Sequence, residues 1–346
     1  MEVIVVINLM KKVYRKIFKK KLFIFDLEKN YIAEIKNVSF NQLIAIDGIG
    51  FSGSSAVTDF LGEFDCNTTC GGVDLYENPE RGLDNNYETD FFRDPYSVLD
   101  LEKICYNHVT RIGDQAIKDF IKTVELNYTR GPSLIFHNDI YLKSSKEFIL
   151  NLVDFVTSIH GQPRYIVKSM TAKQYRSYAK DYILKILSSI NSKTNLVMDN
   201  LISIEYPDCE IINDYFPDNT KLIYVWRDPR DIYAQARMTI HEDCAWVPEK
   251  PEVFIKWYTK AFPYYLNSKC ENIMCVRFED LVLNYDETAK QIFDFLNITD
   301  YENYHINKKK FFNPNISKNN IGLYKNYVDQ TSIKYIYENL KDFCYE

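Results

Sequence analysis

Short apolar runs alternate with amphipathic segments along much of this chain. Four runs have the length of buried strands, at residues 43–46, 196–198, 221–226 and 273–276. Four segments carry apolar residues at helical spacing, at residues 56–61, 252–266, 286–296 and 332–343. Strands that alternate with helices predict an α/β fold, with a mainly parallel central sheet covered by helices on both faces.

Two regions depart from this alternation. Residues 63–102 are acidic, aromatic and rich in turn residues, which predicts irregular structure, and residues 66–74 contain no convincing strand. From residue 100 to about 193 the spacing of apolar residues is helical, and one predicted face contains Phe148, Ile149, Leu152, Val153 and Val156. We therefore predict a basic appendage over residues 1–40 and a catalytic domain over residues 41–346, with a helical acceptor-binding insertion over about residues 95–193.

The charge distribution limits the classes of partner. The chain has 346 residues, of which 46% are hydrophobic and 26% charged, as in ordinary globular proteins. Its net charge is −6, and residues 1–40 hold nine Lys/Arg against four Asp/Glu, so the remainder carries −11. A duplex nucleic-acid binder is usually basic across a whole face, so nucleic acid is not an expected partner. The basic appendage, with apolar residues interleaved, is suited to contact an anionic membrane surface; the alternative is a solvated surface element.

The location predicted from the sequence is cytoplasmic, with membrane association through residues 1–40 left open. The apolar run at residues 3–10 is too short to span a bilayer, and it precedes its basic cluster, the reverse of a secretory signal. The eight cysteines form no Cys-x-x-Cys pair, which favours reduced thiols in a reducing compartment.

A glycine-rich loop joins the first predicted strand to the first predicted helix. It reads Gly48-Ile49-Gly50-Phe51-Ser52-Gly53-Ser54-Ser55. A loop of this kind presents unpaired backbone N–H groups to an anion. It also fits G-x-G-x-x-G, but a Rossmann dinucleotide site needs a second strand that ends in an acidic residue about 20 positions on. The loop lacks the Lys-Ser/Thr ending of a P-loop, which disfavours an ATP or GTP hydrolase. A tight turn without a ligand is the remaining alternative.

A second strand-to-helix junction carries arginines. The strand at residues 222–226 leads into Arg227-Asp228-Pro229-Arg230-Asp231 and then a helix. An arginine at this position can bind a phosphate through two parallel N–H hydrogen bonds. The two junctions together predict a ligand with phosphate groups at two ends. Asp228 and Asp231 are expected to cap or orient the helix, and structural ion pairs are expected for Arg230, Arg237, Arg277 and Asp280.

Over roughly residues 41–340, these motifs resemble the sulfotransferase family, which uses 3′-phosphoadenosine 5′-phosphosulfate (PAPS). Four segments match in order: Ser52-Gly53-Ser54-Ser55, Arg227–Asp231, Val276-Arg277-Phe278-Glu279-Asp280-Leu281, and Ser317–Tyr327. The resemblance implies sulfuryl transfer from PAPS to a hydroxyl group by in-line displacement. The moving group carries less charge than a phosphoryl group, so positioned N–H groups and cations can stabilise the transition state without a metal.

The resemblance also implies roles for individual residues. The 5′-phosphosulfate would lie in the loop formed by Gly50, Phe51, Ser52, Gly53, Ser54 and Ser55. The 3′-phosphate would be clamped by Arg227, with Gln235 as a hydrogen-bond donor and Ser317 and Lys318 from the late basic loop. The product would be adenosine 3′,5′-bisphosphate.

The sequence departs from the family pattern at two positions of the first loop. Phe51 stands where the family has Lys or Arg, so another cation is expected to neutralise the leaving phosphate, and Lys168 and Arg93 are candidates. Ala56 stands where an aromatic residue often follows, so adenine stacking must come from elsewhere.

The general base is expected at the end of the strand before the arginine strand, where Asp199-Asn200 lies. By the resemblance, Asp199 is the first candidate to accept the proton of the acceptor hydroxyl, and His137 and His241 are rivals. The alternative for Asp199 is that it caps the segment that follows.

The expected acceptor is a saccharide or glycolipid hydroxyl, which would suit a basic membrane-touching appendage. The abundance of Lys, Asn, Ile and Tyr indicates an AT-rich genome and favours a bacterial source. Two alternatives stay open: a catalytically inactive nucleotide-binding module, suggested by Phe51, and a Rossmann-type NAD(P) oxidoreductase.

Overall fold

The computed structural model describes most of the predicted catalytic domain. The described residues are 40–70, 117–118, 120–122, 124, 138–157, 163–190, 193–199, 201–202, 209–238, 247–266, 270–299 and 309–346. Those from 117 to 186 belong to one compact unit, and those in 40–70 and 187–346 belong to a second.

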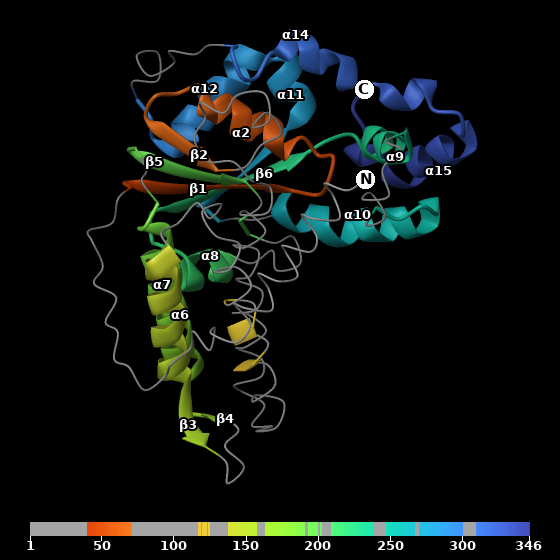
Figure 1. Cartoon of the computed structure of the whole chain (residues 1–346). Helices are drawn as coiled ribbons and strands as arrows, with labels where there is room; N and C mark the ends of the chain where they lie inside the picture. The colour runs from red at the N-terminus through yellow and green to blue at the C-terminus, as the bar shows by residue number, and fades with distance from the viewer. Residues whose placement is uncertain are drawn as a thin grey trace, which may run out of the picture. The chain divides into compact units, whose positions relative to one another are not determined.

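A five-stranded parallel sheet forms the centre of the second unit (Figure 1), in the order β2-β5-β1-β6-β7. Its strands are β1 (Gln42–Gly48), β2 (Asn67–Cys70), β5 (Asn195–Asp199), β6 (Thr220–Trp226) and β7 (Ile273–Arg277). The register pairs Ile46 with Asp199 and Gly48 with Val225. It also pairs Trp226 with Arg277, so the glycine loop, the end of β5 and the arginine junction meet at the carboxyl edge of the sheet.

Both faces of this sheet are buried, which explains why its central strands are almost continuously apolar. On β1, Ile44 and Ile46 belong to a core cluster, whereas Leu43 and Ala45, also fully buried, point to the opposite face. The predicted α/β fold with a mainly parallel sheet is confirmed.

Helices lie on both sides of the sheet, with α2, α11 and α12 on one side and α8 and α10 on the other (Figure 1). The helices of this unit are α2 (Ser54–Gly62), α8 (Cys209–Tyr215), α9 (Pro229–Met238), α10 (Pro251–Leu266), α11 (Phe278–Leu283), α12 (Tyr285–Leu296), α14 (Pro314–Ser317) and α15 (Gln330–Leu340). Three short 3-10 turns complete it: η4 (Lys318–Asn320), η5 (Leu323–Asn326) and η6 (Lys341–Phe343). Buried aromatic rings join α2 to α12, with the Phe60 and Phe293 centroids 5.7 Å apart.

The first unit contains two helices and a hairpin: α6 (Asn138–Leu152), β3 (Val153–Thr157), β4 (Pro163–Val167) and α7 (Ala172–Leu187). The two helices pack through stacked rings of Phe148 and Tyr182, 4.9 Å apart, and Ser145 Oγ lies 3.0 Å from the Tyr182 hydroxyl. Lys185 also links them, because its Nζ lies 2.8 Å from Glu147 on α6.

Two predictions of secondary structure were wrong. Asn67–Cys70 is a strand, although we expected irregular structure there. It is a short polar edge strand, and its pairing with β5, not an apolar pattern, defines it. Helix α6 ends at Leu152, and Val153 and Val156 lie on β3 because β-branched residues favour a paired strand over continued helical spacing.

No helix within the described ranges is long and apolar enough to cross a membrane. The predicted division into residues 1–40, 41–346 and an insertion at about 95–193 stays a prediction.

Candidate functional site

The backbone conformation of the glycine loop requires glycine at two positions. A Cβ at Gly48 would overlap Ser52 Oγ and lie 2.5 Å from the Val225 carbonyl oxygen. Gly53 has φ 93°, and a Cβ there would lie 2.5 Å from the Phe278 ring. Phe51 has φ 62°, which is unusual for a residue with a side chain and is typical of functional loops. Steric contacts therefore specify the conformation of this loop, in contrast to an ordinary turn.

The start of α2 presents donors without acceptors. Gly53 is the N-cap and makes no side-chain capping bond. Among the described residues, nothing accepts a hydrogen bond from the backbone N–H groups of Gly53, Ser54 and Ser55. Ser52 adds a fully buried hydroxyl that has no partner in the described part of the chain. These groups, at the positive end of a helix, form a cradle for an anion.

Arg227 joins the glycine loop to the late part of the chain. Its side chain is buried, and Nη1 donates to the Phe51 carbonyl at 3.0 Å and to Gln235 Oε1. Nη2 donates to the Asn320 carbonyl on η4, and the guanidinium lies 5.1 Å from the centroid of the Phe278 ring. The Nε–H is buried and makes no hydrogen bond within the described residues.

Three carboxylates keep Arg227 charged despite its burial. Desolvation lowers the pKa of Arg227, and the negative charges of Asp231, Glu279 and Asp228 oppose that shift. A cation held in this way can compensate the charge of a phosphate in a site that excludes water.

Asp199 lies beside the glycine loop, as the sequence predicted from its place at the end of a strand. Its Oδ2 accepts a hydrogen bond from Ser55 Oγ at 3.2 Å, and its side chain is buried. The same edge of the sheet therefore holds a carboxylate next to the anion cradle.

Asp231 attaches the late segment to α9. Its two carboxylate oxygens accept the backbone N–H groups of Gly322 at 2.7 Å and Tyr324 at 3.0 Å. Because Asn320 is also bound by Arg227, the segment of Ser317 and Lys318 is brought next to the arginine junction. Asp231 thus orients this late segment and also stands in the first turn of its own helix, where a negative charge is favourable.

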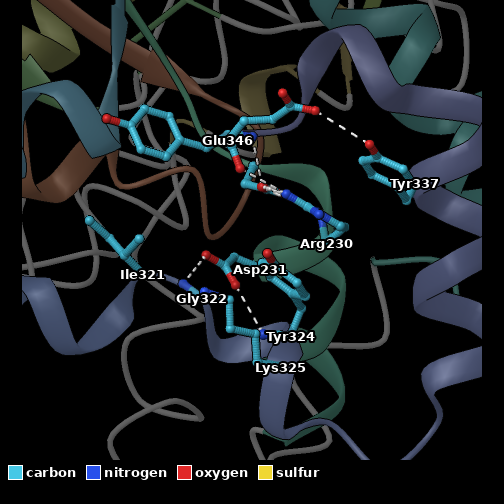
Figure 2. A pocket seen from close by; sticks show the side chains of 10 residues that line it. Arg230, Asp231, Ile321, Gly322, Tyr324, Lys325, Tyr337 and Glu346 are labelled. Atoms are coloured by element: carbon cyan, nitrogen blue, oxygen red, sulfur yellow. Dashed lines mark hydrogen bonds and ion pairs between the residues drawn. The ribbon is translucent and has the colours of Figure 1, made fainter.

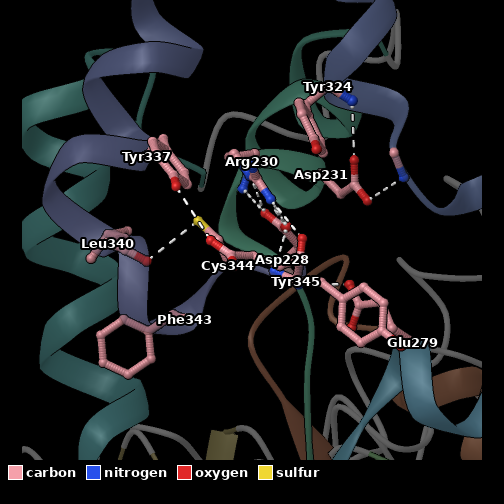
Figure 3. Close-up of polar contacts among 12 residues, drawn as sticks. Asp228, Arg230, Asp231, Glu279, Tyr324, Tyr337, Leu340, Phe343, Cys344 and Tyr345 are labelled. Atoms are coloured by element: carbon pink, nitrogen blue, oxygen red, sulfur yellow. Dashed lines mark hydrogen bonds and ion pairs between the residues drawn. The ribbon is translucent and has the colours of Figure 1, made fainter.

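A second polar network supports the junction (Figure 3). Asp228 caps α9 by accepting the Arg230 N–H at 2.8 Å, and its carboxylate also pairs with the Arg230 guanidinium, whose Nη2 lies 2.6 Å from Oδ2. Glu279 Oε1 accepts the Asp228 N–H at 2.8 Å, and Arg277 Nε lies 3.6 Å from Glu279 Oε2. The expectation that Arg230 and Arg277 form structural ion pairs agrees with these contacts.

A pocket of about 440 Å³ lies beside this network (Figure 2). Its lining includes Arg230, Asp231, Gly322, Tyr324, Tyr337 and Glu346. The Arg230 guanidinium lies 4.1 Å from the centroid of the Tyr324 ring and 5.1 Å from that of Tyr337, so two tyrosines hold it at the pocket wall.

The remaining candidate residues are not tested by the structure. Lys168 belongs to the other compact unit, where its Nζ donates to the Leu150 carbonyl at 2.7 Å and lies 3.8 Å from Asp154. The other candidates, Arg93, His137, Asn200 and His241, lie outside the described residues.

Three contacts at the site were missed in the sequence analysis: the Phe278 ring against Gly53, the Asn320 carbonyl on Arg227, and Glu279 on the Asp228 N–H. Phe278 and Glu279 immediately follow β7, a position that points to the site. The role of Asn320 has no sequence signal because a backbone carbonyl carries it. No cluster of three or more His, Cys, Asp or Glu side chains that could hold a metal occurs in the described part of the chain.

The tight fit of Gly53 gives a stability prediction. Gly53→Ala should lower the free energy of unfolding by about 2–4 kcal/mol, because alanine is strained at positive φ and its methyl group would overlap the Phe278 ring. Urea unfolding checks this. Gly62→Ala, at the end of the same helix and without a positive φ, is the matched control and should change stability by less than about 1 kcal/mol. Equal effects of the two substitutions would contradict the proposed strain.

Burial of Glu279 gives a pH prediction. Desolvation raises the pKa of Glu279 to about 7 from the usual 4.5, so the folded protein holds this proton more tightly than the unfolded chain. Relative to Glu279→Gln, the wild type should therefore lose about 2–3 kcal/mol of stability as the pH rises from 5 to 8. Urea unfolding of both proteins at the two pH values measures this difference, and a difference that does not change with pH would refute the prediction.

The strand order separates this site from a dinucleotide fold. The sequence argument against a Rossmann fold was that no strand follows the glycine loop, and β2 shows that one does. In a Rossmann sheet, however, the strand that follows the first helix lies next to the first strand. Here β5 lies between β1 and β2, so the connection skips one position. The strand order is therefore stronger evidence against a Rossmann fold than the sequence pattern was.

Comparison with known proteins identifies part of the chain. Residues 204–339 match the family model of the sulfotransferase domain. This range contains three of the four motifs on which the resemblance was based, and the glycine loop lies before it. The resemblance to sulfotransferases is thus confirmed over that range. No curated protein matches the chain.

Several solved structures are similar to the chain at low identity. The sulfotransferase domain from the Synechococcus PCC 7002 olefin synthase is 12% identical, over 92% of this chain and 99% of that one, with a TM-score of 0.40. The sulfotransferase domain from the curacin biosynthetic pathway is 13% identical, over 87% and 98% of the two chains, with a TM-score of 0.38. Sulfotransferase STF9 from Mycobacterium avium is 11% identical, over 88% and 76%, with a TM-score of 0.37.

Proposed function

We propose, from the membership of residues 204–339 in the sulfotransferase domain family, that this protein transfers a sulfuryl group from PAPS to a hydroxyl group. The observation that carries the proposal is the contact of Arg227 with both the glycine loop and the late segment. This contact joins, at one edge of the sheet, the groups suited to the two phosphate-bearing ends of PAPS.

In this proposal the two ends of the donor have separate sites. The free N–H groups of Gly53, Ser54 and Ser55 would hold the 5′-phosphosulfate, together with the Ser52 hydroxyl. Arg227 would bind the 3′-phosphate through its guanidinium, whose Nη2 already contacts the late segment at Asn320. The exposed Lys318 on η4 would add a second positive charge.

Gln235 makes a contact besides the one expected. Its Oε1 accepts a hydrogen bond from Arg227, so it orients the guanidinium. Donation from Gln235 to the 3′-phosphate stays part of the proposal.

The transfer step follows from the same arrangement. The acceptor oxygen forms a bond to sulfur while the bond from sulfur to the bridging oxygen breaks, and adenosine 3′,5′-bisphosphate leaves. Asp199 would take the proton of the acceptor hydroxyl, because it is the carboxylate next to Ser55. The amides at the start of α2 would stabilise the negative charge that develops on the leaving phosphate.

The acceptor and the location extend the proposal on sequence grounds alone. A saccharide or glycolipid hydroxyl remains the proposed acceptor. The basic residues 1–40 would bring a cytoplasmic enzyme to an anionic membrane surface where such glycolipids lie.

A catalytically inactive nucleotide-binding module is the second candidate, because Phe51 stands at the loop position where the sulfotransferase family has Lys or Arg. The two functions differ in turnover. Incubation with PAPS and a panel of mono- and oligosaccharides and glycolipids should release adenosine 3′,5′-bisphosphate in step with sulfation of one acceptor. Tight binding of the bisphosphate without turnover on any acceptor would favour the inactive module.

A further inference from the structure

Residues 343–346, the last of the chain, lie across the ends of β6 and β7. The Tyr345 N–H donates to Asp228 Oδ2 at 2.9 Å, and the Tyr345 carbonyl accepts from Arg230 Nη2 at 2.9 Å (Figure 3). The Phe343 carbonyl accepts from Arg277 Nη2 at 2.8 Å. Three backbone groups therefore bind this 343–346 segment to the polar network that supports the arginine junction.

The hydrogen bond from the Tyr345 N–H is the contact that ties the Asp228 carboxylate to another part of the described chain. The Asp228 carboxylate is 1% exposed, and its other donors, the Arg230 backbone and guanidinium, come from the same turn. Among the described residues, the Tyr345 N–H is the one donor to this carboxylate from outside the turn. Since a buried carboxylate needs its hydrogen bonds, the position of Tyr345 restrains that of Asp228.

The Tyr345 side chain reinforces the same arrangement. The Arg277 guanidinium lies 4.0 Å from the centroid of the Trp226 ring and 5.0 Å from that of Tyr345. Trp226 is the residue before Arg227, and Asp228 is the residue after it. The 343–346 segment thus contacts Asp228 directly and Trp226 through Arg277, so it restrains the residues on both sides of Arg227.

We propose that Tyr345 is a positioning residue for Arg227 and acts through its backbone N–H. By fixing Asp228, it directs the Arg227 guanidinium toward Phe51, Gln235 and Asn320, and so toward the 3′-phosphate of the donor. This inference rests on the proposed function, because it assigns the 3′-phosphate to Arg227.

Tyr345→Pro tests the role of this N–H, because proline has no backbone donor. Cys344 has φ −74° and ψ 149°, the conformation that a residue before proline prefers, so the substitution adds no strain there. The Kd for adenosine 3′,5′-bisphosphate, measured by calorimetry, should rise at least fivefold, and the KM for PAPS should rise similarly. The kcat and the KM for the acceptor should change less than twofold, whereas a loss of folded protein alone would lower the apparent kcat and leave the Kd unchanged.

Val328→Pro is the matched control. Val328 is 90% exposed, its N–H donates to nothing within the described residues, and Tyr327 before it has φ −73° and ψ 137°. This variant should bind the bisphosphate as the wild type does. If Tyr345→Pro does not fold by circular dichroism, Asp228→Ala removes the acceptor of the same contact and should raise the Kd at least fivefold.

The outcomes separate this inference from the proposed function. A wild type that binds the bisphosphate, with a Tyr345→Pro variant within twofold of its Kd, would overturn the positioning role and leave the function standing. A wild type that binds no bisphosphate would overturn both. An equal loss of affinity in Val328→Pro would show that proline at either site disturbs the fold, and it would overturn the specific role of Tyr345.

Discussion

Arg227→Ala should remove measurable binding of adenosine 3′,5′-bisphosphate and, with it, activity. In the proposed complex this side chain makes charge-assisted hydrogen bonds to the 3′-phosphate, each worth about 1.5–3 kcal/mol. Loss of two such bonds corresponds to at least roughly a 100-fold rise in Kd. Calorimetry on the purified variant measures it.

The same substitution should also destabilise the protein. The Phe51 and Asn320 carbonyls and Gln235 Oε1 would lose their shared donor, at a cost of about 2–4 kcal/mol. Binding must therefore be measured at a temperature at which the variant is folded. Arg227→Lys keeps the charge but loses the planar fork, so it should bind more weakly than the wild type and more tightly than Arg227→Ala.

Arg237→Ala is the control for loss of an arginine from the same part of the chain. Arg237 lies at the end of α9, where it donates to the Val247 carbonyl and lies 3.9 Å from Glu249. It should leave the Kd for the bisphosphate within about twofold. If Arg227→Ala binds as Arg237→Ala does, the 3′-phosphate does not lie on Arg227.

Asp199→Asn should lower kcat by roughly 10²- to 10⁴-fold while leaving the affinity for adenosine 3′,5′-bisphosphate nearly unchanged. Asparagine keeps an oxygen that can accept from Ser55 Oγ, so the geometry at the start of α2 is retained. It cannot take a proton from the acceptor hydroxyl, and positioned general bases contribute about this much to catalysis.

Single-turnover and steady-state rates with PAPS and the acceptor check this second prediction. Asp294→Asn makes the same chemical change at an exposed site on α12 and should leave the rate as in the wild type. An Asp199→Asn enzyme with a kcat within threefold of the wild type would exclude Asp199 as the base and move the search to the rival histidines.

The parts of the fold that depend on local patterning were predictable from the sequence. β1, β5 and β6 are apolar because both of their faces are buried, and α10 and α12 have clear helical spacing. β2 was missed because Asn67–Cys70 is polar and is a strand through its pairing with β5, which lies far away in the sequence. The end of α6 was missed because apolar residues at 153 and 156 suit a helix face and a strand equally well.

The candidate site shows the same division. Gly53, Arg227 and Asp199 could be proposed from the sequence because each stands at the end of a predicted strand, where catalytic and binding side chains gather. Asn320 and Tyr345 contact the site through backbone groups, so no side-chain motif in the sequence predicts these contacts. Phe51 is the reverse case: its side chain departs from the family pattern, while its carbonyl oxygen accepts a hydrogen bond from Arg227.

The most direct test of the central claim is a thermal-shift titration of the full chain with adenosine 3′,5′-bisphosphate, with NADH and ATP as comparisons. Binding at 100 times Kd should add about 2.7 kcal/mol of stability, which is a shift of several degrees. We expect this shift with the bisphosphate and not with NADH or ATP. A shift with NADH alone, or no shift with the bisphosphate, would contradict the assignment of the glycine loop and Arg227 to a sulfotransferase donor site.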